Sequence, residues 1–421
     1  MKTLYDASVH FYKFLIWCFS FFNTKAKQWI DGRKNLFDQL QVKMNHCKHP
    51  SSIWVHCASL GEFEQARPLI EKIKINYPHY NLLLTFFSPS GYEIRKNYSY
   101  ADCVCYLPLD TKQNAREFIS ITKPSLVFFT KYEYWYHYIN ELHKRNIPLI
   151  VFSAIFRENQ IFFKWYGQFF RDMLKKVTMF FVQDERSKHL LHSIGITNVE
   201  ICSDTRFDRV IQVKESVRHI EGVEEFKKQK KLMVCGSVWE EDMNVLIPFI
   251  NRNISTFQFI IAPHEIHHKQ IAAWQKQLKC SSVLYSSFDK QKIVECNVLL
   301  IDSIGLLSAL YSYADIAYVG GAFSKGLHNI LEASVYGIPV FFGPKYKKYR
   351  EAVELIELKC AFPITNSDDL ASSIQQYLQR PADGEIFQQR LHTYFESKKG
   401  GTEMILNYIN KNNYRWLNVP A

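Results

Sequence analysis

Glu62 has surroundings that suit a catalytic carboxylate. It follows Ser59-Leu-Gly61 in a turn between an apolar strand predicted over 53–57 and a helix predicted from Phe63. Gly61 has no side chain, so a ligand can approach the backbone closely. A carboxylate in this turn can take the proton of an attacking hydroxyl group. Equally, Glu62 can be a first-turn acid that stabilises the helix dipole, and the turn alone leaves both interpretations open.

A second strand-to-helix turn is rich in glycine. It includes Gly320 and Gly321, follows an apolar strand predicted over 316–319, and leads into a segment with His328 and Glu332. Backbone amides in such a turn, together with a helix N-terminus, can hold a phosphate. On a helix His328 and Glu332 share one face, where Glu332 can bind ribose hydroxyls. The alternative is a polar pair on a solvated helix.

Two further turns and a basic loop complete the candidates in the second half. Gly236-Ser237 ends the first strand of that half, and Gly343-Pro344 ends the last strand predicted there. A basic loop follows, which is either solvated or holds anionic groups of a substrate or a membrane lipid. Its cations are Lys345, Lys347, Lys348 and Arg350.

One formal metal motif is interpreted as a coincidence. The stretch from His264 to His268 satisfies H-E-x-x-H, which requires a helix to hold both histidines on one face. Here it comes directly after Pro263, at a turn that follows a predicted strand. No apolar-flanked D-x-D motif occurs either, so a metal-dependent reaction is not favoured.

These turns need parallel sheets to position them. Short apolar segments alternate with helical segments from residue 52, and a second such series follows the charged stretch 214–231. This pattern predicts two doubly wound α/β halves joined near residues 210–230. Ligands bind such sheets at the carboxyl ends of the strands, where the strand order reverses. Strands are predicted over 53–57, 81–86, 103–106, 125–129, 148–152, 179–182, 232–235, 257–261, 298–301, 316–319 and 339–342, and helices over 63–77, 111–119, 135–144 and 385–412.

The first thirty residues differ from the rest. The run 11–22 is apolar and aromatic, but Asp6, His10 and Lys13 interrupt the stretch too often for a comfortable membrane span. Residues 1–50 carry eight basic and three acidic residues, which suits an anionic leaflet. We therefore expect an interfacial or marginally inserted helix at the membrane. The alternative is a helix that packs on its own domain.

Composition agrees with a globular, two-domain protein. The 421 residues are 47% apolar and 15% aromatic, which excludes a disordered chain. The net charge of +11 favours an anionic partner, namely nucleic acid, a phosphate-bearing ligand or a membrane surface. The ten cysteines include no C-x-x-C pair and indicate buried free thiols in a reducing compartment. Cys103 and Cys105 are expected to face one side of a strand.

Taken in order along the chain, these motifs resemble those of the 3-deoxy-D-manno-octulosonic acid (Kdo) transferases of lipid A and lipopolysaccharide biosynthesis. The resemblance extends from about residue 10 to the C-terminus. It rests on Ser59-Leu-Gly-Glu62, Tyr132-Glu133-Tyr134-Trp135, Val182-Gln183-Asp184-Glu185, Asp204-Thr-Arg206-Phe207-Asp208, Gly236-Ser237, Leu300-Ile-Asp302-Ser-Ile-Gly305, Tyr318-Val-Gly-Gly321, His328-Asn-Ile-Leu-Glu332 and Phe342-Gly-Pro344.

This resemblance implies a fold, a reaction and a place in the cell. The fold is GT-B, with two Rossmann-like domains that face a cleft and an N-terminal membrane-associated helix. The reaction is inverting transfer of Kdo from CMP-Kdo to a tetraacyl lipid A precursor (lipid IVA), without a cofactor or a metal. The place is the cytoplasmic side of the inner membrane, on its anionic lipids, with no nucleic acid as partner. The expected divisions are 1–30 (membrane-associated segment), 31–213 (acceptor domain), 214–384 (donor domain) and 385–421 (a C-terminal helix able to return to the first domain).

The resemblance also assigns roles to single residues. Glu62 matches the general base of S-x-G-E. Glu133 matches the second acid of E-T-E-L-W, which implies a second catalytic residue near the acceptor side of the cleft. Ser59 and Gly61 fall in the acceptor-binding turn. The residues that match donor-binding positions are Arg206, Gly236, Ser237, Gly320, Gly321, His328, Asn329 and Glu332.

The chain departs from the family pattern at five positions. Lys131 replaces the first acid of E-T-E-L-W, and Tyr136 replaces the proline that follows this motif. His264 stands where an arginine is expected after Pro263, and it or Lys269 is a candidate substitute. A glycine and a proline of G-G-H-N-x-L-E-P are replaced by Leu327 and Ala333.

Three other functions remain alternatives. A GT-B transferase with a UDP-sugar donor shares the architecture and the glycine turn. A basic nucleic-acid-binding protein fits the charge, but the aromatic residues lie mostly in apolar runs and no recognised RNA or DNA motif occurs. A catalytically inactive binding relative is disfavoured by the presence of Glu62.

Overall fold

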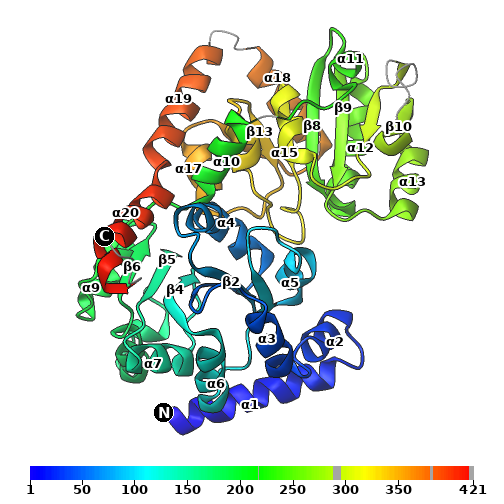
Figure 1. Cartoon of the computed structure of the whole chain (residues 1–421). Coiled ribbons are helices and arrows are strands. Elements are labelled where there is room, and N and C mark those ends of the chain that lie inside the picture. Colours follow the sequence, from blue (N-terminus) through cyan, green and yellow to red (C-terminus); the bar gives the residue numbers. More distant parts are fainter. Residues whose placement is uncertain (217, 288–294, 380–382, 417–421) are drawn as a thin grey trace. The chain divides into compact units, whose positions relative to one another are not determined.

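The computed structural model divides the chain into two units (Figure 1). It describes residues 1–216, 218–287, 295–379 and 383–416. The first unit comprises residues 1–209 together with the C-terminal segment from residue 398, and the second comprises residues 210–397. The change of unit thus comes after Arg209 rather than after residue 213. Residues 385–397 belong to the second unit.

The first unit contains a parallel sheet of seven strands in the order β3-β2-β1-β4-β5-β6-β7. All six predicted strands are present, and the short strand β7 was not predicted. The central strands are buried on both faces, which explains their nearly continuous apolar sequences. The strands are β1 (Ser52–Cys57), β2 (Asn81–Phe86), β3 (Cys103–Tyr106), β4 (Pro124–Thr130), β5 (Leu149–Ala154), β6 (Met179–Val182) and β7 (Val199–Ile201).

Side chains alternate between two apolar cores, one on each face of this sheet. Trp54 points into one core and Val55 into the other. Cys103 and Cys105 share a core, as predicted, and all ten cysteines lie within the described residues as free thiols. The helices that cover the sheet are α4 (Leu60–Asn76), α5 (Pro89–Arg95), α6 (Lys112–Thr122), α7 (Tyr136–Lys144), α8 (Gln168–Leu174) and α9 (Glu185–Ser193), and a 3-10 turn, η1, spans Ile161–Phe163.

Three N-terminal helices also belong to the first unit: α1 (Lys2–Phe19), α2 (Thr24–Asp31) and α3 (Leu36–Asn45). One face of α1 packs on the unit. The Tyr5 hydroxyl donates to Asp110 at 2.5 Å, Asp6 lies 2.6 Å from His137, and Val9 is buried. The other face of α1 is exposed. In the described residues we find no helix both long and apolar enough to cross a bilayer.

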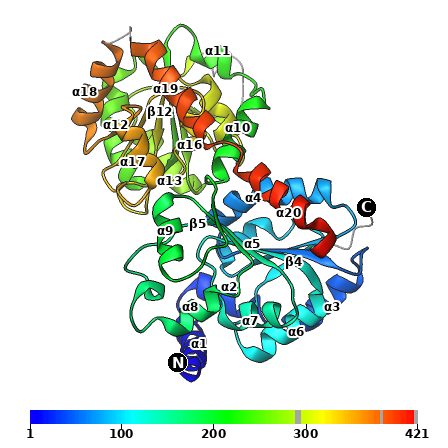
Figure 2. The ribbon, with the colours of Figure 1, turned by 90° about the vertical axis from the view of Figure 1, so that its left-hand side faces the viewer.

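The predicted helix over 385–412 is two helices, α19 (Asp383–Lys398) and α20 (Gly401–Trp416). The helix is interrupted at Gly400, whose φ of 93° is incompatible with a continuous helix. α20 lies against α4 in the first unit (Figure 2), where Tyr77 donates to Asn410 at 2.6 Å.

The second unit contains another parallel sheet of seven strands, in the order β10-β11-β9-β8-β12-β13-β14. The two doubly wound halves are therefore confirmed. The short strands β10 and β14 were not predicted, because they lie at the two edges of the sheet and are less buried than the three-residue strands β11 and β13, so their apolar pattern is weaker. The strands are β8 (Lys231–Val238), β9 (Phe257–Pro263), β10 (Ser282–Leu284), β11 (Val298–Leu300), β12 (Ile316–Val319), β13 (Val340–Phe342) and β14 (Ala361–Pro363).

Helices cover this second sheet on both faces (Figure 1). They are α11 (Val223–Lys227), α12 (Glu240–Asn253), α13 (His268–Gln277), α15 (Leu307–Leu310), α16 (Leu331–Ser334), α17 (Arg350–Glu357) and α18 (Ser367–Leu378), with α10 (Arg206–Glu215) at the change of unit and 3-10 turns η2 (Tyr285–Ser287) and η3 (Tyr311–Tyr313).

Candidate active site

The two catalytic candidates follow the two central strands of the first sheet. β1 and β4 are neighbours, although β1 continues to β2 on one side and β4 to β5 on the other. The strand order reverses between them, which is where open α/β sheets bind ligands. Glu62 lies in the first turn of α4, directly after β1, and Glu133 lies in the loop after β4.

The backbone fixes the Glu62 carboxylate. Its Oε2 atom accepts hydrogen bonds from the amides of Ala58, at 2.5 Å, and Ser59, at 3.2 Å, as part of a capping box. Burial, followed by the negative charge of Glu133, raises the pKa of Glu62 to about 8 despite the Ala58 amide and Lys131, which act in the opposite direction. Glu62 therefore caps the helix and is also a stronger base than an ordinary glutamate.

Glu133 is buried, with 8% of its surface exposed, and two N–H groups hold it. His56 Nε2 lies 3.1 Å from Oε2 of Glu133, and Trp135 Nε1 donates to the same oxygen at 2.7 Å. Nδ1 of His56 lies 2.8 Å from the Thr85 hydroxyl oxygen, which also accepts from Trp54 Nε1 at 2.8 Å. A chain of hydrogen bonds through β1 and β2 thus positions Glu133.

His56 and Thr85 were not predicted as site residues. A usable signal was present, because Trp54 and His56 are two residues apart in a strand and must share a face. Two polar ring nitrogens on one buried face need acceptors, and those acceptors are Thr85 and Glu133.

Gly61 leaves open space beside Glu62. A Cβ atom at this position would meet nothing closer than Ser59 Oγ, at 4.0 Å. Packing within the protein therefore does not require the glycine. The space is compatible with the acceptor-binding role predicted for Ser59 and Gly61.

Lys131 brings a positive charge to the same edge of the sheet. It directly follows β4, and its φ of 64° lies in the left-handed region that lysine rarely adopts. Burial raises the pKa of Glu62 and opposes ionisation of Asp204, whereas the charge of Lys131 favours the ionised form of both. Lys131, which replaces the first acid of the family motif, therefore acts to lower the pKa of Glu62.

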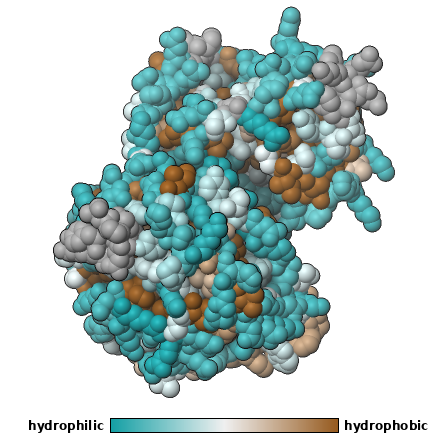
Figure 3. All heavy atoms as spheres, in the orientation of Figure 1, coloured by the Kyte–Doolittle hydropathy of each residue, from teal (hydrophilic) through white to brown (hydrophobic). Residues whose placement is uncertain are grey.

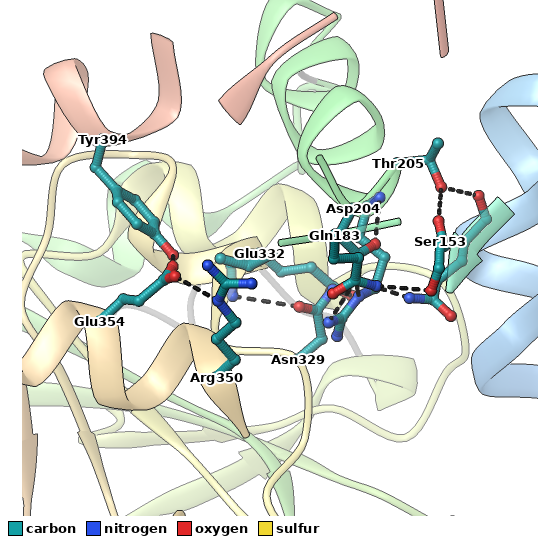
Figure 4. A network of polar contacts seen from close by, with 12 residues as sticks. Ser153, Gln183, Asp204, Thr205, Asn329, Glu332, Arg350, Glu354 and Tyr394 are labelled. Carbon is teal, nitrogen blue, oxygen red and sulfur yellow. Dashed lines mark hydrogen bonds and ion pairs between the residues drawn. The ribbon is translucent and has the colours of Figure 1, made fainter. Parts of the chain in front are cut away.

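Arg206 is positioned by Asp204 in the first unit. Its Nε and Nη2 atoms donate to Asp204 Oδ2 at 3.0 and 2.9 Å, and Gln65 and Gln183 donate to the same oxygen. Figure 4 shows Gln183 beside Asp204, with Ser153 and Thr205 close to each other. Burial opposes ionisation of Asp204, but the guanidinium of Arg206 holds the pKa of Asp204 below its usual value.

In the second unit the strand order reverses between β8 and β12. Gly236 and Ser237 lie near the carboxyl end of β8, and Gly320 and Gly321 follow β12. A Cβ atom at Gly320 would lie 2.4 Å from the carbonyl oxygen of Ser237. The glycine turn is therefore required for the close approach of these two strand ends.

The expected phosphate cradle needs correction. The amide of Gly320 donates to the carbonyl oxygen of Gly236 at 2.9 Å, and the amide of Gly321 donates to Asp242 at 2.9 Å. Asp242 also accepts from the Trp239 amide and the Tyr318 hydroxyl, both at 2.8 Å. The two glycine amides therefore donate to groups of the protein itself, and Asp242 was not predicted as the acceptor for one of them.

His328 lies in a cluster of rings. The His264 ring stacks on it with centroids 4.1 Å apart, and Trp239 Nε1 donates to His328 Nε2 at 3.0 Å. Burial, followed by His264, lowers the pKa of His328 to about 4, so His328 is neutral at physiological pH. His264, a candidate substitute for the missing arginine, thus contacts a predicted donor-binding residue. Trp239 was not predicted.

His328 and Glu332 do not share a helix, because α16 begins only at Leu331. The His328 amide donates to the Gly320 carbonyl, which keeps the preceding segment in the glycine turn. Asn329 Nδ2 donates to Glu332 Oε1 at 3.0 Å, and Asn329 Oδ1 accepts from the Leu331 amide (Figure 4). The expected helical pair is replaced by this contact between Asn329 and Glu332.

The basic loop after β13 is partly paired. Arg350 Nε lies 2.7 Å from Glu354 Oε1, and the Tyr394 hydroxyl donates to the other Glu354 oxygen at 2.7 Å (Figure 4). Lys345, Lys347 and Lys348 are exposed.

The H-E-x-x-H stretch is not a helical motif. His264 and Glu265 lie in the turn after β9, and α13 begins at His268. Among the described residues, no group of three or more His, Cys, Asp or Glu side chains is placed to hold a metal ion.

Comparison with known proteins identifies relatives over most of the chain. Residues 32–209 match the family model of 3-deoxy-D-manno-octulosonic-acid transferase. The Kdo transferase of Aquifex aeolicus is 27% identical, over 82% of this chain and 90% of that protein. The Kdo transferase of Haemophilus influenzae is 24% identical, over 86% of this chain and 87% of that protein.

A longer relative is the bifunctional glycosyltransferase/methyltransferase of Fusobacterium nucleatum. It is 26% identical over 95% of this chain, and the alignment spans only 62% of that protein.

Among solved structures, UDP-GlcNAc 2-epimerase from Neisseria meningitidis superposes with a TM-score of 0.60 at 15% identity. The comparison covers 86% of this chain and all of the epimerase, so the shared feature is the fold of two Rossmann-like domains. Fold, motifs and sequence similarity over most of the chain together show that this chain is similar to the Kdo transferases.

Proposed function

We propose that the chain transfers Kdo from CMP-Kdo to the lipid A precursor lipid IVA, with inversion at the anomeric carbon. The observation that carries this proposal is the Glu62 carboxylate, fixed by two amides and with its pKa raised to about 8. The acceptor hydroxyl oxygen bonds to the anomeric carbon while the bond from that carbon to the CMP phosphate breaks. Glu62 takes the hydroxyl proton, and CMP leaves with the bonding electrons.

Glu133 supports Glu62 in this reaction. Its burial and its bonds to His56 and Trp135 leave little of it to touch a substrate. Its negative charge instead makes Glu62 more basic. We therefore assign Glu133 as a positioning residue, in place of the second catalytic acid that the resemblance implied.

The second unit is the proposed donor site. Gly236, Ser237, Gly320 and Gly321 lie at its floor, where Gly320 lets the ends of β8 and β12 approach closely. His328, Asn329 and Glu332 line the following loop, where the Glu332 carboxylate can accept hydrogen bonds from ribose hydroxyls. Positive charges of Lys325 and the basic loop are proposed to stabilise the leaving CMP in place of a metal, since the sequence has no apolar-flanked D-x-D.

Association with the cytoplasmic side of the inner membrane is proposed from α1. Its exposed side carries Leu4, Phe11, Phe14, Leu15 and Trp17, while Tyr5 and Val9 pack inward. Large apolar side chains on one exposed helix face favour insertion into the interface of a bilayer. Figure 3 shows tan and white atoms along the lower right edge, where part of α1 lies, beside a mostly hydrophilic surface.

Mass spectrometry of a reaction with lipid IVA tests the transfer. We expect a product heavier by one or more Kdo residues with CMP-Kdo, and none with UDP-sugars or with the Glu62→Gln variant. Transfer from a UDP-sugar instead would contradict the donor assignment.

Vesicle flotation tests the membrane proposal. Changing Phe11, Phe14 and Leu15 to serine is expected to release the protein from anionic vesicles, because the inward contacts of α1 remain. The matched control changes Val42, Ile75 and Ile94, which are also exposed apolar residues of the first unit, to serine. Equal loss of binding in both triple variants would show that α1 is not the anchor.

A further inference from the structure

We propose that a cavity between α1 and α2 binds the phosphate group of an anionic lipid. The cavity lies wholly within the first unit and has a volume of about 350 Å³. It is lined by Lys13 of α1, Trp29 and Ile30 of α2, Arg33 and Lys34 of the following turn, and Leu109 after β3, among others. The choice of a lipid as the ligand rests on the proposed membrane association, but the existence of an anion site does not.

Arg33 supplies a positive charge that has no acidic partner among the described residues. Its guanidinium donates to three backbone carbonyl oxygens, those of Leu107, Trp29 and Phe87, at 3.0, 3.1 and 2.8 Å. It also lies over the rings of Trp29, at 3.9 Å, and Tyr106, at 4.7 Å. Burial lowers the pKa of Arg33 to about 9, and the neighbours that counteract this are tyrosines and a cysteine.

A partly buried charge that lacks an acidic partner among the described residues favours the binding of an anion nearby. Arginine has five N–H donors, and the three carbonyl bonds leave two N–H groups available for a ligand. Phosphate oxygens are the acceptors that a guanidinium binds most strongly.

Trp29 is the second, independent observation. It lines the same cavity and is 5% exposed, and its indole Nε1 is a buried donor with no acceptor among the described residues. Buried polar groups normally have partners, and one without a partner often marks a ligand or an ion. An anionic oxygen in the cavity gives this N–H an acceptor and also balances the charge of Arg33.

The position of the cavity favours a lipid as the source of the phosphate. Lys13 connects the cavity to α1, and Trp17 lies one helical turn further along the same helix. Phe11, Phe14 and Leu15 beside it are exposed. A lipid with its phosphate in the cavity can therefore lay its acyl chains along the apolar side of α1.

The test uses the full chain labelled with ¹⁵N-tryptophan. The indole signal of Trp29, one of eight tryptophans, is identified by its absence in Trp29→Phe. We expect this signal to move when monomeric dihexanoyl phosphatidylglycerol is added and to stay in place with uncharged dihexanoylglycerol. A Trp29 signal unaffected by phosphatidylglycerol overturns the proposal. An equal response to inorganic phosphate at the same concentration overturns the lipid assignment and leaves a simple anion site.

Calorimetric titration of the same lipid tests the two side chains. Trp29→Phe keeps the ring and removes the donor, and we expect about tenfold weaker binding. Lys13→Gln is expected to weaken binding. The matched control is Lys25→Gln, which removes the charge of another exposed lysine in the N-terminal segment. Unchanged affinity in both Trp29→Phe and Lys13→Gln contradicts the site. Neither measurement uses vesicles or activity, so a failure here is distinct from a failure of Kdo transfer or of membrane association.

Discussion

His56 Nε2 lies 3.1 Å from Oε2 of Glu133 in the interior of the first unit. Carboxylate oxygens only accept hydrogen bonds, so Nε2 of His56 carries a hydrogen. The bond holds the Glu133 carboxylate at the point where the strand order reverses, and there its charge acts on Glu62. Glu133 thus raises the pKa of Glu62, and Lys131 lowers it.

The first prediction concerns pH. We expect kcat/KM to rise with pH, with the midpoint of this rising limb near pH 8, because only the ionised form of Glu62 accepts a proton. Removing the positive charge in Lys131→Met destabilises that form and moves the limb to higher pH, whereas Glu133→Gln moves it to lower pH. Lys131→Arg retains the charge and is the control. A limb that stays in place in both charge-removing variants would show that neither residue tunes Glu62.

The second prediction concerns the base itself. Glu62→Gln retains an oxygen for the amides of Ala58 and Ser59, so the fold is expected to persist. Turnover should fall by about 10²- to 10⁴-fold, the usual effect of losing a general base. Circular dichroism checks the fold, and near-normal turnover would exclude Glu62 from this role.

The third prediction is that the same variant becomes more stable relative to the wild type as the pH rises. The folded pKa of Glu62 is about 8 against an ordinary value of 4.5, so the folded state binds this proton more tightly than the unfolded state. The stability from this proton is fully present below 4.5 and is lost as pH rises through 8. The melting temperature of Glu62→Gln relative to wild type should therefore increase between those two values. A constant difference across this range would contradict a raised pKa.

The fourth prediction concerns Glu332. Glu332→Ala should raise the KM for CMP-Kdo about 10- to 150-fold, since a hydrogen bond to a charged group contributes about 1.5–3 kcal/mol. The KM for the lipid should change much less. Glu357→Ala, an exposed acid at the end of α17, is the matched control. An unchanged donor KM would assign Glu332 to structure.

The fifth prediction is that EDTA leaves the activity unchanged. The positive charges proposed to stabilise the leaving CMP are side chains, and a chelator does not remove them. The assay compares initial rates before and after dialysis against EDTA. Activity that is lost and then restored by magnesium would contradict this.

Local pattern predicted most of the framework. The strands over 81–86, 103–106 and 179–182 have the predicted bounds, because a buried parallel strand is a short apolar run between turns. The prediction of one continuous C-terminal helix was wrong at Gly400. The left-handed backbone of this residue ends the helix, although the apolar periodicity continues beyond it.

The sequence by itself determined the two doubly wound halves, the turns that follow β1 and β12, and the candidate base, since strand patterns and turn residues are properties of neighbouring positions. Only the tertiary structure decided what those residues meet. His56 reaches Glu133 across 77 positions, and the Gly321 amide reaches Asp242 across 79. Such partners are chosen by which strands become neighbours in the sheet. The pKa of Glu62 and the internal use of the glycine amides follow from that choice, because burial and charge act through space and not along the chain.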